Sequence, residues 1–292
     1  MKPDLAHIGG ALARDATVGH GLFSLLPTGD AETSCGTSYA APLVARTLAQ
    51  LDAAIEGETK RETLLALLIH GARVPAPLTD KTLMSVARDL VGFGMPTNAV
   101  DILQTDDHEI ALVFESRILP NTEMNFQFAW PPSLVGADGT CRGVARVTLV
   151  ARPPFDVRHG AEFVRVNLDA KLQQEHKGAW KGRLVPTFLP EGASDGLEQD
   201  RIEHALKWGP VKTYQGRFPK GVGASSNWRV QVEYIARALE TMPPDGVPFT
   251  LVLTIADIEK AAPVFRELRQ ALRTQGVALS DIHTAVRVRP RA

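Results

Sequence analysis

The sequence has almost no cysteine and no long apolar run, and its charges nearly cancel. Cys35 and Cys141 are its only cysteines, so the chain can form one disulfide at most and lacks the cysteine spacings of a metal site. No apolar stretch approaches the roughly 18 residues that span a bilayer. A formal net charge of −1 gives no electrostatic reason to expect a nucleic acid or an anionic membrane as partner.

A secretory signal is also missing, because the N-terminus lacks the charged and apolar blocks of one. This absence and the scarcity of cysteine favour a cytoplasmic protein in a reducing compartment. What remains is the composition of a globular protein, with 44% hydrophobic and 22% charged residues. A chain of 292 residues is long enough for two domains of ordinary size.

Residues 1–104 have the pattern of an α/β domain. Val44, Leu48, Leu51 and Ile55 are spaced by four, three and four residues, which places them on one face of a helix. A second helix is predicted over 61–70, where leucines on nearly every side indicate deep burial. A glycine-rich turn and a short helix ending near residue 103 complete this part.

From residue 105 to 292 the pattern changes to alternation of apolar and polar residues, which is typical of half-buried strands. Several such strands in succession predict an antiparallel β-sandwich. A helix near 264–272 interrupts the series, and a long exposed loop is expected near 173–205. The strands are predicted over 124–130, 145–151, 228–234, 249–255 and 283–289.

Ser38 stands in the segment that carries chemistry, Gly36-Thr37-Ser38-Tyr39-Ala40-Ala41-Pro42. A serine hydroxyl needs a base to take its proton and donors to stabilise the oxyanion. At the start of a helix the backbone N–H of Ser38 is free, and the helix dipole favours the developing negative charge. Gly36 permits a tight approach, and Pro42 is expected in the first turn. A simpler interpretation is that Thr37 or Ser38 only caps the helix.

Taken as a whole, Gly36–Pro42 resembles the serine motif of the subtilisin-like serine proteases, the subtilases. Lys2-Pro3-Asp4 resembles the strand entry that precedes this motif in the family. The helix from Leu64 to Ala72 and the turn at Gly92–Gly94 are similar to the elements that finish a subtilase core. His7-Ile8 departs from the pattern, since many relatives have Ala-Pro there. The resemblance covers about residues 1–104.

This resemblance implies that residues 1–104 are the C-terminal part of a parallel-sheet α/β catalytic domain. It implies a serine endopeptidase that acts on peptides or proteins through an acyl-enzyme on Ser38, with Gly36, Thr37 and Pro42 as motif support. It implies no cofactor and no metal. In subtilisin the triad follows the chain order Asp, His, Ser. The acid and the base should therefore precede Ser38.

The 37 residues before Ser38 contain neither of the segments expected to carry the acid and the base. His7 and His20 are the only histidines there, and loop positions suit both better than a catalytic role. In subtilisin the loss of the histidine costs on the order of a million-fold in turnover. We therefore expect the triad Asp and His to lie outside this chain, in a missing N-terminal segment, and the chain alone to be inactive.

Other candidate residues have simpler interpretations. Asp30 and Glu32 fit solvated loop carboxylates, and His70 fits a helix C-terminus or a core position. Trp180, Trp208 and Trp228 could line a peptide or sugar groove, although the strand around Trp228 favours core packing. Asp156, His159 and Glu162 have no third partner at metal-ligand spacing.

The C-terminal half carries a second resemblance, at Phe155–Arg158, Leu206–Lys212 and Pro248–Ile255. These segments are similar to parts of bacterial subtilases that carry a β-sandwich behind the protease core. Some members of that group are paired with an AAA-type ATPase. An alternative function is therefore a non-catalytic protease remnant that binds or regulates a partner such as that ATPase.

Overall fold

The computed structural model describes residues 4–11, 20–80, 82–104, 106–184 and 208–282. The contacts within it divide the chain into two compact units. The first unit holds the described residues of Met1–Thr59 and Gly71–Leu103. The second unit holds those of Lys60–His70 and Gln104–Ile282. In the part of the chain that is described, no helix is long and apolar enough to cross a bilayer.

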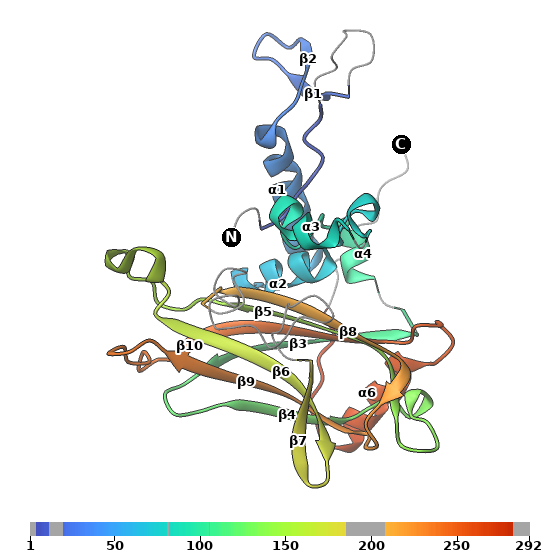
Figure 1. Cartoon of the computed structure of the whole chain (residues 1–292). Coiled ribbons are helices and arrows are strands. Elements are labelled where there is room, and N and C mark those ends of the chain that lie inside the picture. The colour runs from blue at the N-terminus through green and yellow to red at the C-terminus, as the bar shows by residue number, and fades with distance from the viewer. Residues whose placement is uncertain (1–3, 12–19, 81, 105, 185–207, 283–292) are drawn as a thin grey trace. The chain divides into compact units, whose positions relative to one another are not determined.

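The first unit consists of a β-hairpin and short helices around one long helix (Figure 1). The 18-residue α1 follows directly on the hairpin, and its predicted apolar face packs against α4. Leu51 on that face is fully buried, whereas Phe23 on the hairpin is 83% exposed and Val100 on α4 is 76% exposed. The elements are β1 (Leu22–Leu25), β2 (Ala31–Ser34), α1 (Thr37–Ala54), η1 (Ala76–Leu78), α3 (Met84–Val91) and α4 (Ala99–Leu103).

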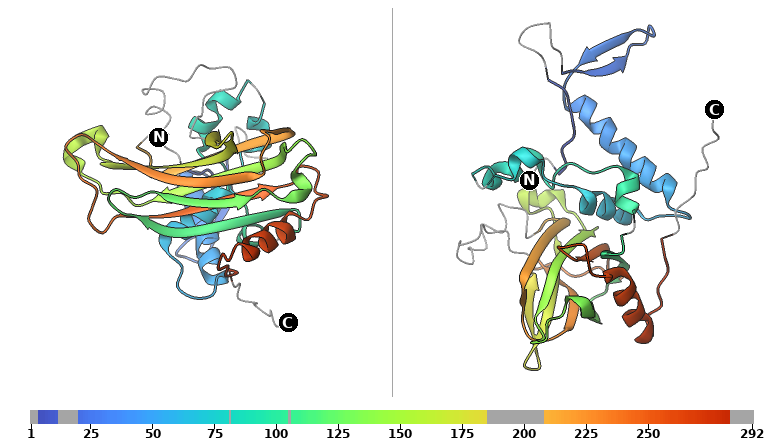
Figure 2. Two further views of the ribbon diagram at one scale, coloured as in Figure 1. Left: turned by 90° about the horizontal axis from the view of Figure 1, so that it is seen from below. Right: turned by 90° about the vertical axis from the view of Figure 1, so that its right-hand side faces the viewer.

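The second unit is built on two four-stranded sheets, in the orders β3-β10-β5-β8 and β4-β9-β6-β7 (Figures 1 and 2). Every pairing within them is antiparallel. One core cluster draws side chains from both sheets, so the sheets pack face to face. The strands are β3 (Glu109–Ile118), β4 (Met124–Ala129), β5 (Cys141–Ala151), β6 (Val166–His176), β7 (Ala179–Leu184), β8 (Val211–Val222), β9 (Asn227–Ala236) and β10 (Val247–Ala256).

The alternating segments of the sequence supply this core. On β10, Phe249 and Leu251 face inward and are almost fully buried. Trp130, directly after β4, and Trp228, on the neighbouring strand β9, contact each other in the core with ring centroids 4.3 Å apart. The strands predicted over 124–130, 145–151, 228–234 and 249–255 are therefore confirmed. The predicted helix is α6 (Val264–Thr274), which packs beside β3, β4 and η2 (Pro132–Leu134).

The expected loop at 173–205 is wrong in its first part. Residues up to 184 form the β6–β7 hairpin, in which His176 pairs with Ala179. Lys177 and Gly178 between them both have positive φ, at 52° and 78°. This is the two-residue turn whose twist suits a hairpin. The polar composition that suggested a loop belongs to a hairpin at the sheet edge, with one side exposed to solvent. The rest of the expected loop, 185–205, and the strand expected at 283–289 lie outside the described residues.

The antiparallel, β-rich part of the fold prediction is thus confirmed. Every strand pair and isolated bridge among the described residues is antiparallel. The described residues of the first unit contain one two-stranded sheet, formed by β1 and β2. The parallel sheet implied by the resemblance is not seen in the described part of the chain.

Helix α2 (Arg61–Gly71) covers the outer face of the β3-β10-β5-β8 sheet through hydrogen bonds between side chains. The Thr63 hydroxyl lies 3.0 Å from that of Thr250 on β10. At the last residue but one of the helix, His70 lies between Thr148 on β5 and Thr254 on β10, with each ring nitrogen 2.8 Å from a hydroxyl. Residues 60–70, expected within the N-terminal domain, therefore group with the second unit.

Candidate functional site

Ser38 is the second residue of α1 and lies exposed at its N-terminal end. Gly36 is the N-cap residue, with φ 147° and ψ 170°, and no side chain caps the helix. The first-turn bonds run from Tyr39 N and Ala40 N to Gly36 O. Within the described residues, neither the hydroxyl nor the N–H of Ser38 has a hydrogen-bond partner. The simple capping role considered for Thr37 and Ser38 is therefore wrong.

Pro42 lies later than the sequence suggested. The helix begins at Thr37, so Pro42 is its sixth residue and falls in the second turn instead of the first. A proline there cannot donate to the carbonyl of Ser38, four residues earlier. The first turn of α1 is consequently held by fewer backbone bonds than an ordinary helix start.

The N-terminal segment lies against the serine motif. Gly36 N donates to Gly9 O at 2.7 Å. A Cβ on Gly9 would lie 3.0 Å from Gly36 O, so the close approach suits a glycine. Upstream of Gly9, the chain pairs with the glycine turn, since Phe93 N donates to Asp4 O and Ala6 N to Gly94 O. Three segments that carry the sequence resemblance are thus brought together in the first unit.

The described residues supply no base or acid to Ser38. His7 Nδ1 accepts from the neighbouring Ile8 N, and His20 forms a bridge with Ala11. Asp30 accepts from Thr28 in the hairpin turn, and Glu32 is exposed on β2. Neither histidine nor either carboxylate is hydrogen-bonded to Ser38. The arrangement offers an exposed hydroxyl at a positive helix end, without the group that would activate it.

Of the three tryptophan candidates, one lies in the core and two contact arginines. Trp228 is completely buried in the core, as its strand position predicted. The guanidinium of Arg229 lies 4.7 Å from the ring centroid of Trp180, and that of Arg237 lies 4.0 Å from the ring centroid of Trp208. In each contact the guanidinium covers one face of the indole ring, and cation–π contacts of this kind are stabilising.

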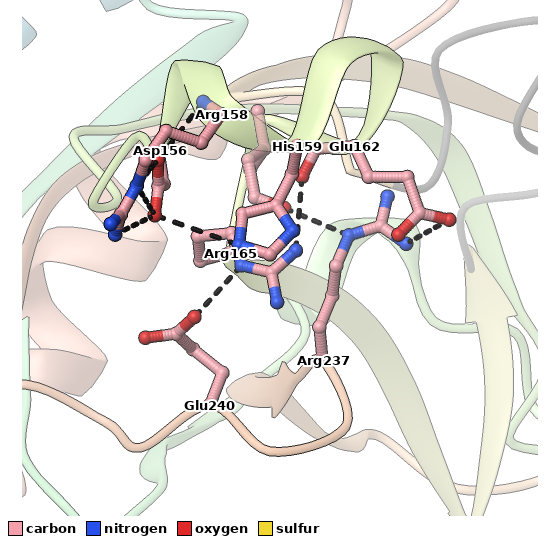
Figure 3. A network of polar contacts seen from close by, with 8 residues as sticks. Asp156, Arg158, His159, Glu162, Arg165, Arg237 and Glu240 are labelled. Carbon is pink, nitrogen blue, oxygen red and sulfur yellow. Dashed lines mark hydrogen bonds and ion pairs between the residues drawn. The ribbon is translucent and has the colours of Figure 1, made fainter.

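Asp156, Glu162 and Glu240 in the second unit are each paired with an arginine (Figure 3). Asp156 accepts from Arg158 through the side chain and the backbone N–H, and these bonds hold the pKa of Asp156 well below its usual range. His159 Nε2 lies 3.5 Å from the same carboxylate. No group of three or more metal-ligating side chains occurs among the described residues. Two further ion pairs complete the network, Arg237–Glu162 at 3.2 Å and Arg165–Glu240 at 2.8 Å.

A buried polar cluster at the edge of the sandwich was missed by the sequence analysis. The ammonium group of Lys212, on β8, reaches across to β6 of the other sheet. There it donates to Asn167 Oδ1 at 2.6 Å, to Leu168 O and to Asp169. The available signal was Lys212 two residues before the apolar Tyr214, which places a lysine on the inward face of a strand.

No protein-family model matches this chain, and no curated protein matches it either. Among solved structures, it is similar to dimeric latent PorU from Porphyromonas gingivalis, with a TM-score of 0.23 and 10% sequence identity. That match covers 52% of this chain, and the chain spans 13% of that protein. A similarity of this size carries no argument about fold or function.

Proposed function

We propose that this chain is the C-terminal part of a subtilisin-like serine endopeptidase, with Ser38 as the nucleophile that forms an acyl-enzyme with a peptide substrate. In this proposal the first unit completes a parallel-sheet core whose remaining strands lie outside the chain. The acid and the base of the triad lie there too, and the chain alone has no turnover.

The position of Ser38 is the observation that supports the proposal. It is exposed at the second position of an 18-residue helix, next to a glycine N-cap. Its N–H has no partner within the described residues and can stabilise an oxyanion that forms on the adjacent acyl carbon. The partial positive charge at the start of α1 acts in the same direction.

The lack of a base near Ser38 supports the second half of the proposal. A hydroxyl with no base partner is a poor nucleophile at neutral pH. The described residues place no histidine or carboxylate in hydrogen-bond reach of Ser38, and the proposal assigns its activation to another polypeptide segment.

The test joins the chain to the polypeptide encoded directly upstream of Met1 in the same reading frame. The purified joined protein should hydrolyse casein and react with a fluorescent fluorophosphonate, and Ser38→Ala should remove both activities. The loss in turnover should be on the order of 10⁴-fold or more. Ser34→Ala, four residues earlier on β2, is the matched control and should retain activity.

Labelling of Ser38 in the 292-residue chain by itself would contradict the requirement for an external base. If the joined protein is folded but neither labels nor hydrolyses, the enzymatic proposal is wrong. That outcome would favour the non-catalytic alternative, in which the chain binds a partner such as an AAA-type ATPase. A pull-down with the product of the neighbouring gene would then be the next measurement.

A further inference from the structure

Lys212, Asn167 and Asp169 form a closed hydrogen-bonded group of three side chains. Lys212 Nζ donates to Asn167 Oδ1 at 2.6 Å and also to Asp169 Oδ1. Asn167 Nδ2 in turn donates to Asp169 Oδ2 at 2.8 Å. The carboxylate therefore contacts both nitrogen atoms, the amine of Lys212 and the amide nitrogen of Asn167.

This group is removed from water. Lys212 and Asn167 are each 1% exposed, and the side chain of Asp169 is 15% exposed. Asp169 accepts directly from Nζ, so its carboxylate is placed to take a proton from the ammonium and leave a neutral, nucleophilic amine.

The carbonyl oxygen of Asn167 is also polarised. Besides Lys212, the backbone N–H of Trp208 donates to Asn167 Oδ1 at 2.9 Å. A donor at this atom stabilises the negative charge that develops there when a nucleophile adds to the amide carbon. The group thus holds a nucleophile, a proton carrier and an oxyanion donor around one amide.

From this geometry we propose that Lys212 and Asn167 become joined by an isopeptide bond, formed by the folded chain itself with Asp169 as proton carrier. The inference is independent of the proposed protease function, because all three residues lie in the second unit and none takes part at Ser38.

The reaction balances without an oxidant or a reductant. Lys212 passes a proton to Asp169, and its neutral Nζ adds to Cγ of Asn167. Asp169 then gives that proton to Nδ2, the Cγ–Nδ2 bond breaks, and ammonia leaves past the partly exposed carboxylate. Of the three ammonium protons, one stays on the new amide, one reaches Nδ2, and one departs with ammonia as ammonium.

The bond would join two sheets. Lys212 lies on β8, the edge strand of one sheet, and Asn167 lies on β6 of the other, 45 residues earlier. Tyr214 reaches the same edge of β6, where its hydroxyl donates to Ala170 O, and this hydroxyl has no part in the proposed reaction. Tyr214→Phe is therefore a matched control that disturbs the neighbourhood and leaves the reaction intact.

The test is the intact mass of the purified full chain. The expected mass is lower than the sequence mass by about 17 Da, the mass of one ammonia. A tryptic digest should contain residues 166–171 joined to residues 208–217, with no cleavage after Lys212. Lys212→Arg and Asp169→Ala should have the full mass of their sequences, and Tyr214→Phe should keep the loss.

A salt-bridged ammonium with three acceptors would satisfy the same hydrogen bonds without any covalent change. If the wild-type chain has the full mass of its sequence and trypsin cleaves after Lys212, the group is only salt-bridged and the proposal is wrong. This outcome does not depend on whether the variants fold. Cyclisation of Asn167 onto its own backbone also releases ammonia. A loss of about 17 Da that persists in Lys212→Arg would assign the change to that reaction and overturn the proposal as well.

Discussion

The first unit and the second unit bury very different shares of their apolar side chains. In the second unit both sheets and α6 contribute to one continuous core. In the first unit Leu51 is fully buried, but large apolar side chains on the hairpin, α3 and α4 remain exposed. The unit that contains Ser38 is thus the one with the weaker core, and the proposed nucleophile and the large core lie in different parts of the chain.

This contrast has a physical consequence. Burial of apolar surface is the main favourable contribution to folding, so the second unit has the means to be stable by itself. A two-stranded hairpin such as β1–β2 is at best marginally stable unless something packs on it. We therefore expect the first unit to gain its stability from the additional strands invoked in the proposed function.

A matched pair of leucine truncations tests the contrast most strongly. Leu251→Ala, in the second unit, should lower the free energy of unfolding by roughly 2–5 kcal/mol, because it leaves a cavity in a close-packed core. Leu90→Ala, on exposed α3, should change it by no more than about 0.5 kcal/mol. Both are measured by urea denaturation, followed by circular dichroism and by fluorescence of the four tryptophans, all of which lie in the second unit.

Equal losses from Leu251→Ala and Leu90→Ala would break the comparison. They would mean that the apolar face of α3 is covered in solution, for example by a second copy of the chain.

The two cysteines provide a reporter in each unit. Cys35 is half-buried and Cys141 is fully buried, and both are free thiols. Burial raises the pKa of the Cys141 thiol, although hydrogen bonds from Trp228 and Gln174 oppose this, so little thiolate forms at pH 8. Iodoacetamide should alkylate native Cys35 at least about a hundredfold faster than Cys141, as read by mass spectrometry of the peptides.

In concentrated guanidinium chloride the two cysteines should react at similar rates, which controls for local sequence effects. Comparable rates in the native chain would show that the second unit opens as readily as the first.

The bonds between α2 and the sheet can be tested with Thr63→Val. Valine has a similar shape but leaves the buried hydroxyl of Thr250 without this partner. The free energy of unfolding of the second unit, read by tryptophan fluorescence, should fall by about 1–3 kcal/mol. Thr79→Val in the first unit removes an exposed hydroxyl that donates to Ala76 O and should leave this signal unchanged. If Thr63→Val leaves the free energy of unfolding unchanged, the assignment of α2 to the second unit is wrong.

The smallest effect is expected at the exposed Asp156–Arg158 pair. Hydrogen bonds from Arg158 lower the pKa of Asp156 in the folded chain below its unfolded value of about 3.9. The carboxylate therefore contributes stability above about pH 4, and this contribution is lost as the pH falls through the folded pKa. Asp156→Asn should lower the midpoint temperature slightly at pH 7, with a difference that shrinks towards pH 3. If the difference in midpoint temperature between Asp156→Asn and the wild type grows as the pH falls, the folded-state pKa of Asp156 is raised and this prediction is wrong.

The strands that could be predicted from the sequence are those in which one face is uniformly apolar. Phe249, Leu251 and Leu253 on β10 alternate cleanly with smaller residues, and periodicity found that strand. On β8 the inward-facing Lys212 stands two residues before Tyr214 and reaches acceptors on the other sheet. A lysine on the buried face interrupts the apolar alternation, so periodicity did not find β8.

The candidate sites divide in the same way. Ser38 could be found because a helix start with Gly36 before it is encoded in adjacent residues. Asn167 and Lys212 are 45 residues apart and meet only when two sheets pack. Local sequence patterns carry no information about contacts between distant strands. The role of a lysine on an apolar face can be recognised only when the structure shows its hydrogen-bond acceptors.

The placement of residues 60–70 determines where the chain could be cut to give separate units, whether in a recombinant fragment or through gene recombination. The chain enters the second unit after Thr59, returns to the first after His70, and leaves it again after Leu103. A fragment cut at residue 104 would lose α2 and expose the threonine-rich face of its sheet to water. A single recombination breakpoint cannot separate the two units either. A protein that kept the sandwich without the serine motif would therefore need another element in place of α2 on its sheet.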